Sequence, residues 1–280
     1  METETYIVDE DKVFETEVPR EWHNRQRVLL ACARGLTMRE RSLTKDLLRL
    51  LPHCKGDSKL EKKGIKSQLQ FSCSSKSADN FLYFEKRGER LMLYVGKQPN
   101  GPTFRFAVHK VVPMTDFKFG GNGLRHSRPL LSFCPQFETQ GILKLLRYNL
   151  VDIFNTPKAH PKSQPFTDRV ISFSVDPQNP AFILFRHFQI LRNSKEETEL
   201  VEIGPRMNLE IASVVEGFLD GSLLYENPLY MTRREAKAIR KQEENTRRKT
   251  KEDDKQERLK RKERIDINEE ESSMDEFGEA

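Results

Sequence analysis

Residues 27–52 read RVLLACARGLTMRERSLTKDLLRLLP, and this stretch combines two hydrophobic patterns. Residues 27–32 form a short apolar run that is typical of a buried strand, and an Arg-Gly turn follows it. Thr37 and Glu40 have the spacing of a capping box, which marks the start of a helix. Leucines then recur at one-face helical spacing until a proline ends the pattern. The stretch therefore predicts a strand, a turn and a helix.

The rest of the chain up to about residue 230 extends this α/β pattern. Residues 53–78 are rich in Lys and Ser and predict a long basic connection, because they show little apolar patterning. Short strands are predicted at residues 81–84, 91–95, 104–108, 129–133, 170–175, 182–190 and 200–203. Helices are predicted around residues 142–153 and 211–218, the second after the turn Gly204-Pro205-Arg206. The order strand, Arg-bearing turn, helix thus occurs twice, which indicates an internally duplicated α/β architecture.

The charges of this 280-residue chain fall into blocks, although its net charge is only +5. Residues 1–24 predict a flexible acidic arm, and residues 25–230 predict the folded domain. Residues 231–264 contain 15 basic and 8 acidic residues and predict a charged helix or a disordered extension. Residues 265–280 contain 7 acidic residues and no basic one, and predict an acidic tail. The folded part is therefore more basic than the whole chain, which favours a polyanionic partner.

The chain shows none of the common signatures of catalysis or of metal binding. There is no Gly-x-Ser-x-Gly, Walker, His-Glu-x-x-His or dinucleotide-binding motif, so we expect neither an enzyme nor a cofactor. The four cysteines are far apart and predict reduced thiols in an intracellular protein, without a metal site. The longest apolar run is only six residues, at 28–33, so we expect no signal peptide and no membrane span.

Candidate phosphate-binding residues, which would be RNA-binding residues if the polyanion is RNA and not an anionic membrane surface, are arginines, lysines and glycines near turns and helix starts, where phosphate contacts are commonly made. The alternative for each is a solvated basic surface or a plain chain reversal. The candidates are Arg34, Gly35, Arg39, Arg41, Lys45, Arg125, Arg128, Lys158, Lys162, Gly204 and Arg206. Aromatic strand residues could stack on bases, but their alternation favours core packing instead. This expectation covers Phe104, Phe106, Phe182 and Phe188.

Several longer stretches resemble the Brix family. They include SRPLLSF at residues 127–133, HPKSQPF at residues 160–166, LVEIGPR at residues 200–206 and LYENP at residues 224–228. The resemblance spans about residues 25–230. Two of these stretches, KSQPF and YENP, resemble the branch of the family that acts in large-subunit assembly.

This resemblance implies a two-half Brix domain, each half like an anticodon-binding domain, with charged flexible termini. It also implies a nucleolar ribosome biogenesis factor that binds large-subunit pre-rRNA and other assembly factors through a helical partner segment. It implies no catalysis, no membrane and no small-molecule substrate. Three alternatives remain: a small-subunit Brix-type factor binding a small nucleolar RNA, a tRNA-modifying or synthetase-associated enzyme, and a protein-only interaction module.

Overall fold

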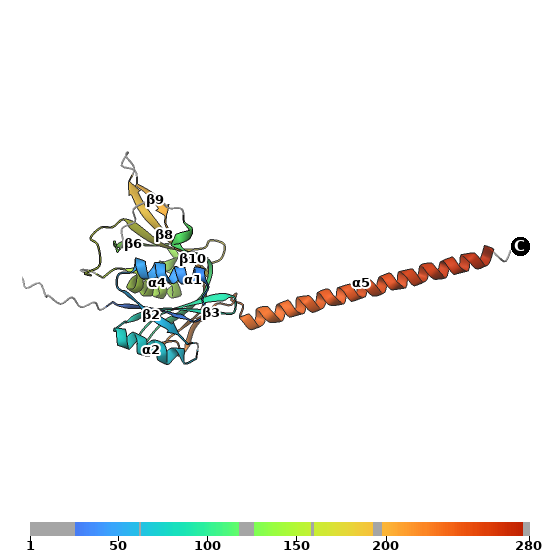
Figure 1. Cartoon of the computed structure of the whole chain (residues 1–280), viewed down its shortest axis with the longest axis horizontal. Helices are drawn as coiled ribbons and strands as arrows, with labels where there is room; N and C mark the ends of the chain where they lie inside the picture. The colour runs from blue at the N-terminus through green and yellow to red at the C-terminus, as the bar shows by residue number, and fades with distance from the viewer. Residues whose placement is uncertain (1–25, 62, 118–125, 158–159, 193–197, 277–280) are drawn as a thin grey trace, which may run out of the picture. The chain divides into compact units, whose positions relative to one another are not determined.

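The computed structural model describes residues 26–61, 63–117, 126–157, 160–192 and 198–276. The chain divides into two units, one ending at Asn227 and one beginning at Pro228. The first unit contains an eleven-stranded mixed sheet with its helices, and the second contains a single long helix (Figure 1). The prediction of an α/β fold is confirmed.

The first half of the sheet begins with β1, which lies between two parallel neighbours. Strands β2 and β3 flank β1, and β3, β4 and β5 then continue as an antiparallel meander. The elements are β1 (Val28–Ala33), α1 (Met38–Leu50), β2 (Cys54–Leu60), α2 (Ile65–Lys76), β3 (Asn80–Arg87), β4 (Arg90–Lys97), β5 (Thr103–Val112) and the short 3-10 helix η1 (Met114–Asp116).

The second half repeats this order without the β2–α2 pair. Strand β6 is parallel to β7, as β1 is to β3. Strands β7, β8 and β10 are then antiparallel in turn, as β3, β4 and β5 are. The elements are β6 (Pro129–Phe133), α3 (Gln136–Thr139), α4 (Gly141–Phe154), β7 (Arg169–Val175), β8 (Phe182–Arg192), β9 (Thr198–Glu202), β10 (Arg206–Val215) and β11 (Leu223–Glu226).

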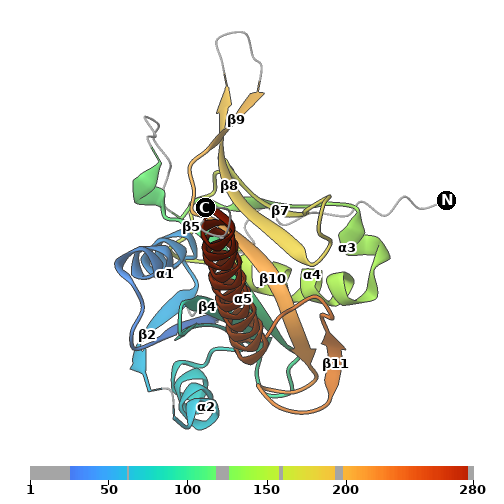
Figure 2. The ribbon, with the colours of Figure 1, turned by 90° about the vertical axis from the view of Figure 1, so that its right-hand side faces the viewer.

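The last main strands of the two halves, β5 and β10, pair with each other and make one continuous sheet. The resulting order is β2-β1-β3-β4-β5-β10-β8-β7-β6, with β9 added to β8 and β11 added to β10. Hairpin β8–β9 extends beyond the rest of the sheet (Figure 2). The predicted internal duplication is confirmed by this matched strand order.

The two halves share one hydrophobic core around helices α1 and α4. Leucines of both helices, among them Leu43 and Leu146, belong to the same buried cluster as Phe106 and Phe185 of the sheet. Figure 1 shows α1 and α4 in the middle of the unit, whereas α2 lies on its outer side. Because each helix has buried leucines on one face only, its other face is free to present polar residues.

The prediction of a helix over residues 211–218 is wrong. These residues belong mostly to β10, which pairs with β5 along its length and with β8 and β11 on its other side. A short apolar run buried on both faces fits a central strand as well as a helix face, so spacing alone could not separate the two. Ile211, Val214 and Val215 are β-branched residues, which suit a strand.

The prediction of a long connection over residues 53–78 is also wrong, because β2 and α2 lie there. An edge strand and a weakly buried helix need few apolar residues: in α2 only Leu69 and Cys73 are buried. Of the four phenylalanines expected in the core, Phe104 and Phe106 are fully buried. Phe182 and Phe188 are only half-buried, since the alternation of β8 places its odd-numbered residues inward.

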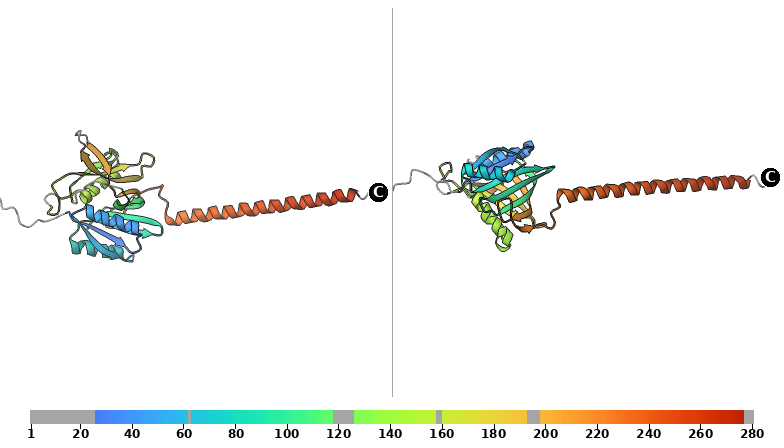
Figure 3. Two further views of the ribbon diagram at one scale, coloured as in Figure 1. Left: turned by 45° about the horizontal axis from the view of Figure 1, so that its top comes forward. Right: turned by 90° about the horizontal axis from the view of Figure 1, so that it is seen from below.

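The second unit contains the helix α5 (Arg233–Glu276), drawn in Figure 3. This helix begins with a second capping box. Thr232 N donates to the Glu235 carboxylate at 2.8 Å, and Glu235 N donates to Thr232 Oγ1 at 3.4 Å. The helix does not stop near residue 264 but continues through most of the acidic stretch that follows. None of the helices in the described part of the chain combines enough length with enough apolar content to cross a bilayer.

Candidate nucleic-acid interface

Three basic side chains form a ridge along the exposed face of α1. Arg41, Lys45 and Arg49 are four residues apart, so they lie on one side of the helix, away from its buried leucines. All three are exposed, and none of them makes an ion pair with another residue that the structure describes. We name these three residues the basic ridge. A row of exposed cations of this kind is suited to phosphate groups.

The turn between β1 and α1 lies at the beginning of this ridge. Gly35 has φ +95°, and its neighbour Arg34 is exposed and lies 3.7 Å from the Glu61 carboxylate. The capping box of α1 is present, with Thr37 N donating to Glu40 at 2.6 Å. Two backbone N–H groups at the helix start are therefore already satisfied, which leaves less free donor capacity for a phosphate than the sequence suggested.

The predicted helix start at Gly204-Pro205-Arg206 does not exist, because strand β10 follows this turn. Gly204 has φ +69°, and a Cβ there would lie 2.4 Å from the Phe117 ring, so only glycine fits. Arg206 Nε donates to Glu202 at 2.7 Å, and the guanidinium lies 5.4 Å from the centre of the Phe117 ring. Arg206 is thus internally neutralised, unlike the residues of the basic ridge.

The segment at η1 nevertheless brings two distant candidates close together. Arg39 of α1 lies 3.6 Å from the carboxylate of Asp116, and Arg206 stacks on the next residue, Phe117. Lys162 is exposed in a turn where its backbone N–H donates to His160 Nδ1 at 3.2 Å. Arg128 is half-buried. The candidates Arg125 and Lys158 lie outside the described residues.

A cavity of about 290 Å³ opens where α1 ends against the second half of the sheet. Arg49 and Thr115 are exposed at its rim, whereas Arg169, His187 and Gln189 are buried on its floor. The full lining is Asp46, Arg49, Leu50, Met114, Thr115, Asp168, Arg169, His187, Gln189 and Ile203. The basic ridge therefore ends at the mouth of a polar cavity.

Two floor residues are held by backbone carbonyl groups. Arg169 Nη2 donates to Leu50 O at 3.0 Å, and its Nε donates to Ser127 O at 3.1 Å. Burial lowers the pKa of Arg169 to about 10, so the guanidinium stays charged at neutral pH. Burial also lowers the pKa of His187 to about 4, so its ring is neutral. Its Nδ1 lies 2.5 Å from Gly204 O and therefore carries the ring proton.

Four residues at this surface were not predicted as site residues from the sequence: Arg49, Arg169, His187 and Gln189. Arg49 continues the four-residue spacing of Arg41 and Lys45, so the same pattern could have identified it. His187 and Gln189 occupy inward positions of β8, and two consecutive inward polar residues are an unusual feature for a buried strand face. No local signal distinguishes Arg169, because its carbonyl partners are 42 and 119 residues away.

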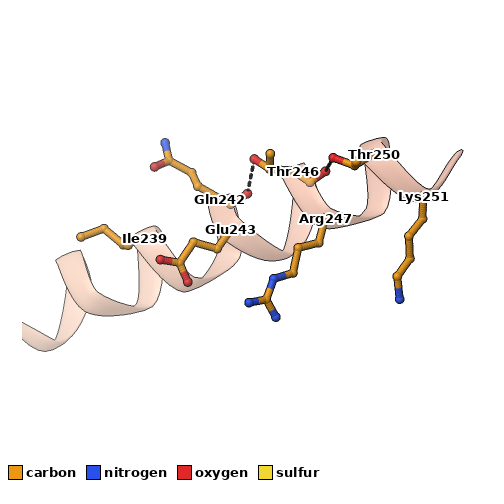
Figure 4. A pocket seen from close by; sticks show the side chains of 7 residues that line it. All are labelled: Ile239, Gln242, Glu243, Thr246, Arg247, Thr250 and Lys251. Carbon is orange, nitrogen blue, oxygen red and sulfur yellow. Dashed lines mark hydrogen bonds between the residues drawn. The ribbon is translucent and has the colours of Figure 1, made fainter. Parts of the chain in front are cut away.

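A hollow along α5 does not make a second site. Its lining side chains all come from one helix, so no opposing wall is present among them (Figure 4). Thr246 Oγ1 donates to Gln242 O at 2.9 Å and Thr250 Oγ1 donates to Thr246 O at 3.0 Å, which satisfies both hydroxyl groups within the helix. An open helical surface of this kind could contact a macromolecule but could not enclose a small ligand.

Comparison with known proteins matches the Brix domain family to residues 33–213. The chain belongs to the Brix family. The Brix domain match runs from the end of β1 into β10, so it covers most of both halves of the sheet and the whole basic ridge. Helix α5 lies outside it.

Brix-family relatives in animals and plants show moderate identity to this chain. It is 42% identical over 212 residues to a ribosome biogenesis protein BRX1 homolog of Caenorhabditis elegans, covering 75% of this chain and 59% of that protein. The human BRX1 homolog is 39% identical, with 75% and 58% covered. Homolog 2 of Arabidopsis thaliana is 37% identical over 230 residues, with 78% and 71% covered. This chain thus spans somewhat less than two thirds of the animal relatives.

A solved structure gives a weaker likeness. The crystal structure of a probable ribosomal biogenesis protein from Aeropyrum pernix K1 matches with a TM-score of 0.43 and 16% identity, covering 66% of this chain and 95% of that one. This likeness is too low to support an inference about the fold.

Proposed function

We propose that this Brix-family chain is a non-catalytic ribosome biogenesis factor that binds precursor RNA of the large ribosomal subunit in the nucleolus. The observation that carries the RNA-binding part is the basic ridge, since Arg41, Lys45 and Arg49 are exposed and make no ion pair within the described structure. The names of the relatives in animals and plants support the assignment to ribosome biogenesis. The large subunit is assigned from the KSQPF and YENP stretches.

The RNA surface of this proposal is centred on α1. Arg34 and Arg39 lie near the start of the same helix, although each faces a carboxylate that a phosphate would have to displace. Both carboxylate contacts are exposed and longer than 3.5 Å, and such ion pairs contribute little to stability. Lys162, Arg128 and Arg206 stay as peripheral candidates. The proposed phosphate contacts are therefore strongest along Arg41, Lys45 and Arg49.

Helix α5 supplies a second contact region for another assembly factor. Its described side chains, which extend to residue 258, are almost all polar and exposed, so this part of the helix has no apolar face that would require a core. A charged helix of 44 residues can pair with a helical partner segment of opposite charge pattern. We assign protein contacts to α5 and RNA contacts to the Brix domain.

Ultraviolet crosslinking of the tagged full chain in cells, followed by sequencing of the attached RNA, tests this function. We expect crosslinks in large-subunit precursor RNA and a nucleolar signal for the tagged protein. Crosslinks concentrated in small-subunit precursor or in a small nucleolar RNA would assign the chain to the other branch of assembly. The absence of crosslinks would favour a protein-only interaction module, and catalytic turnover of tRNA by the pure protein would contradict the proposal.

A triple variant of the basic ridge tests the proposed surface in vitro. The variant combines Arg41→Gln, Lys45→Gln and Arg49→Gln. It should reduce the magnitude of the slope of log affinity against log salt by about 2 for single-stranded RNA, because counterions are no longer released at the three lost phosphate contacts. Lys144→Gln is the matched control, since Lys144 is exposed on α4, the corresponding helix of the other half. An unchanged slope in the triple variant would remove the ridge from the RNA-binding surface.

A further inference from the structure

The basic ridge is an exposed helix face on which like charges lie side by side. Arg41, Lys45 and Arg49 are exposed and four residues apart, so each cation is a neighbour of the next. Like charges at this spacing repel one another and destabilise a helix. No residue in the described ranges forms an ion pair with any of the three. An anionic occupant would relieve this repulsion, whether it is an RNA phosphate or a carboxylate.

The acidic arm of the chain, residues 1–24, contains groups that fit this surface. It has 8 acidic and 2 basic residues. Five of the acidic residues fall within residues 9–17, which read DEDKVFETE. Guanidinium and ammonium groups bind carboxylates and phosphates through the same kind of charge-assisted hydrogen bond. The arm and an RNA strand thus present equivalent partners to the ridge.

The arm joins the Brix domain next to one end of the ridge. Val28, the first residue of β1, is paired with Cys54 of β2, and Val28 N donates to His53 O at 3.3 Å. His53 follows closely on α1, because the helix ends at Leu50. The start of β1 therefore lies beside the end of α1 that contains Arg49, and the arm continues from this place.

The arm is long enough to lie along the whole ridge. The ridge runs from residue 41 to residue 49, which is a rise of about 12 Å along the helix. Residues 18–27 join the acidic stretch to β1 and can span up to about 33 Å. A segment tethered over so short a distance has an effective concentration on the order of millimolar. Even a weak contact with the ridge is therefore well populated in the free chain.

The acidic tail, residues 265–280, is the other candidate occupant within the chain. It has 7 acidic residues, but most of helix α5 separates it from the Brix domain. The helix rises about 1.5 Å per residue, so residues 233 and 265 are about 48 Å apart along it. A helical spacer of this length lowers the effective concentration of the tail at α1. The arm has no such spacer, and it is therefore the favoured occupant.

We propose that the acidic arm occupies the basic ridge in the free chain and that RNA must displace it. Carboxylates of residues 9–17 then face Arg41, Lys45 and Arg49. The contact between arm and ridge follows from their charges and from the place where the arm joins β1, whereas its competition with RNA rests on the proposed function. A strand that contacts only the ridge competes poorly with a tethered segment. The arm thus selects for RNA that makes further contacts with the domain.

Carbodiimide crosslinking of the full chain tests the contact without RNA and without a variant. The reagent joins a carboxylate to a lysine amine that it touches, and Lys45 is the only lysine of the ridge. Mass spectrometry should find arm peptides linked to Lys45, and the link should disappear at about 1 M salt, where charges act over only about 3 Å. Lys144, exposed on α4, is the internal control and should gain no arm link. Links to Lys45 from the tail alone, links formed only between differently isotope-labelled chains, or no link to Lys45 would each overturn the proposal.

Neutralising the arm tests the competition with RNA. The arm variant replaces five carboxylates with amides: Asp9→Asn, Glu10→Gln, Asp11→Asn, Glu15→Gln and Glu17→Gln. The tail variant makes the same change in net charge and is the matched control: Glu269→Gln, Glu270→Gln, Glu271→Gln, Asp275→Asn and Glu276→Gln. A ridge that is free about a tenth of the time binds RNA about tenfold more weakly than an open one. We therefore expect the arm variant to bind single-stranded RNA about tenfold more tightly at low salt, and the tail variant to bind it like the wild type.

The triple variant of the basic ridge shows whether this gain acts through the ridge. Combined with the ridge variant, the arm variant should give no gain in affinity, since the two segments act as one coupled pair. An equal gain with and without the ridge, or an equal gain from the tail variant, would mean a long-range effect of charge and would overturn the proposal. If the arm crosslinks to Lys45 but no chain binds RNA, the proposed function fails and the contact stands. If RNA binds through the ridge but no crosslink forms, the function stands and this inference fails.

Discussion

Helices α1 and α4 occupy corresponding places in the two halves of the Brix domain, but their exposed faces differ. Each helix follows the first strand of its half and buries a row of leucines in the shared core. On α1 the exposed face has the basic ridge. On α4 the residues with the same four-residue spacing are Lys144, Tyr148 and Asp152, of which only Lys144 is basic. Asp152 is acidic, and its carboxylate lies 3.1 Å from Lys97 Nζ. The two halves thus share the same scaffold, whereas the row of positive charges that suits a polyanion lies on α1 and has no counterpart on α4.

The two helices also end in a reciprocal way. The last carbonyl groups of a helix have no partner within the helix and need one from outside. Arg169, at the start of β7, donates to Leu50 O at the end of α1, and His53, which follows α1, has Nε2 at 2.9 Å from Ile153 O near the end of α4. Each half therefore satisfies a carbonyl group of the other half's helix, and these hydrogen bonds add to the continuous sheet and the shared core that join the two halves.

The largest predicted effect concerns the first of these bridges. Arg169→Met should lower the free energy of unfolding by roughly 2–4 kcal/mol, because Leu50 O and Ser127 O would be left buried without their donor. Urea unfolding, monitored by far-ultraviolet circular dichroism, measures the change in the free energy of unfolding. Arg192→Met is the control, since Arg192 is exposed at the end of β8, and it should change stability by less than about 0.5 kcal/mol. Equal effects of the two substitutions would show that the bridge does not join the halves.

A second prediction compares the pH response of two buried histidines, His53 and His187. Burial lowers the pKa of both His53 and His187 to about 4, below the ordinary value of 6.5. Both rings are therefore neutral in the folded chain and protonate more readily when it unfolds. The contribution of these neutral rings to the free energy of unfolding is complete above about pH 6.5 and is lost as the pH falls toward 4. Between pH 7 and pH 5, each ring should lower the free energy of unfolding by about 2 kcal/mol.

Amide substitutions isolate this titration. In His53→Gln the amide nitrogen can replace Nε2 as donor to Ile153 O, and in His187→Asn it can replace Nδ1 as donor to Gly204 O. Each variant should lose less stability than the wild type between neutral and mildly acidic pH, measured by urea midpoints. The double variant should lose the least. If both variants follow the wild-type pH profile, the acid sensitivity belongs to carboxylates and not to these rings.

The repeating local units were predictable from the sequence, and the contacts between them were not. Local geometry determines the spacing of apolar residues, which is three or four residues in a helix and two in a strand. This spacing was sufficient to predict the capping box at Thr37, the helix near residues 142–153 and most strands. The bridge from Arg169 to Leu50 joins residues 119 positions apart, and no local pattern encodes such a distance. The basic ridge was found in part, because its first two residues were identified and Arg49 was not.

The two failures that concern strands share one physical cause. Strand β10 was taken for a helix because it is buried on both faces, and burial on both faces removes the alternation that marks a strand. Strand β2 was overlooked for the opposite reason: it is an edge strand with few apolar residues. In both cases the position of the strand within the sheet determined its composition, and that position depends on pairing with strands far away in the sequence.

The smallest predicted effect returns to the starts of α1 and α4. Thr37 caps α1 with its side chain, whereas Gln140 at the start of α4 makes no such hydrogen bond. Thr37→Ala should cost about 1 kcal/mol, and Gln140→Asp should stabilise the domain by about 0.5–1 kcal/mol, because an aspartate accepts a free N–H and faces the positive end of the helix. Gln140→Ala is the control for side-chain removal. An aspartate variant no more stable than the alanine variant would mean that the first amides of α4 already have partners, and the two helices would then differ in charge but not in how they begin.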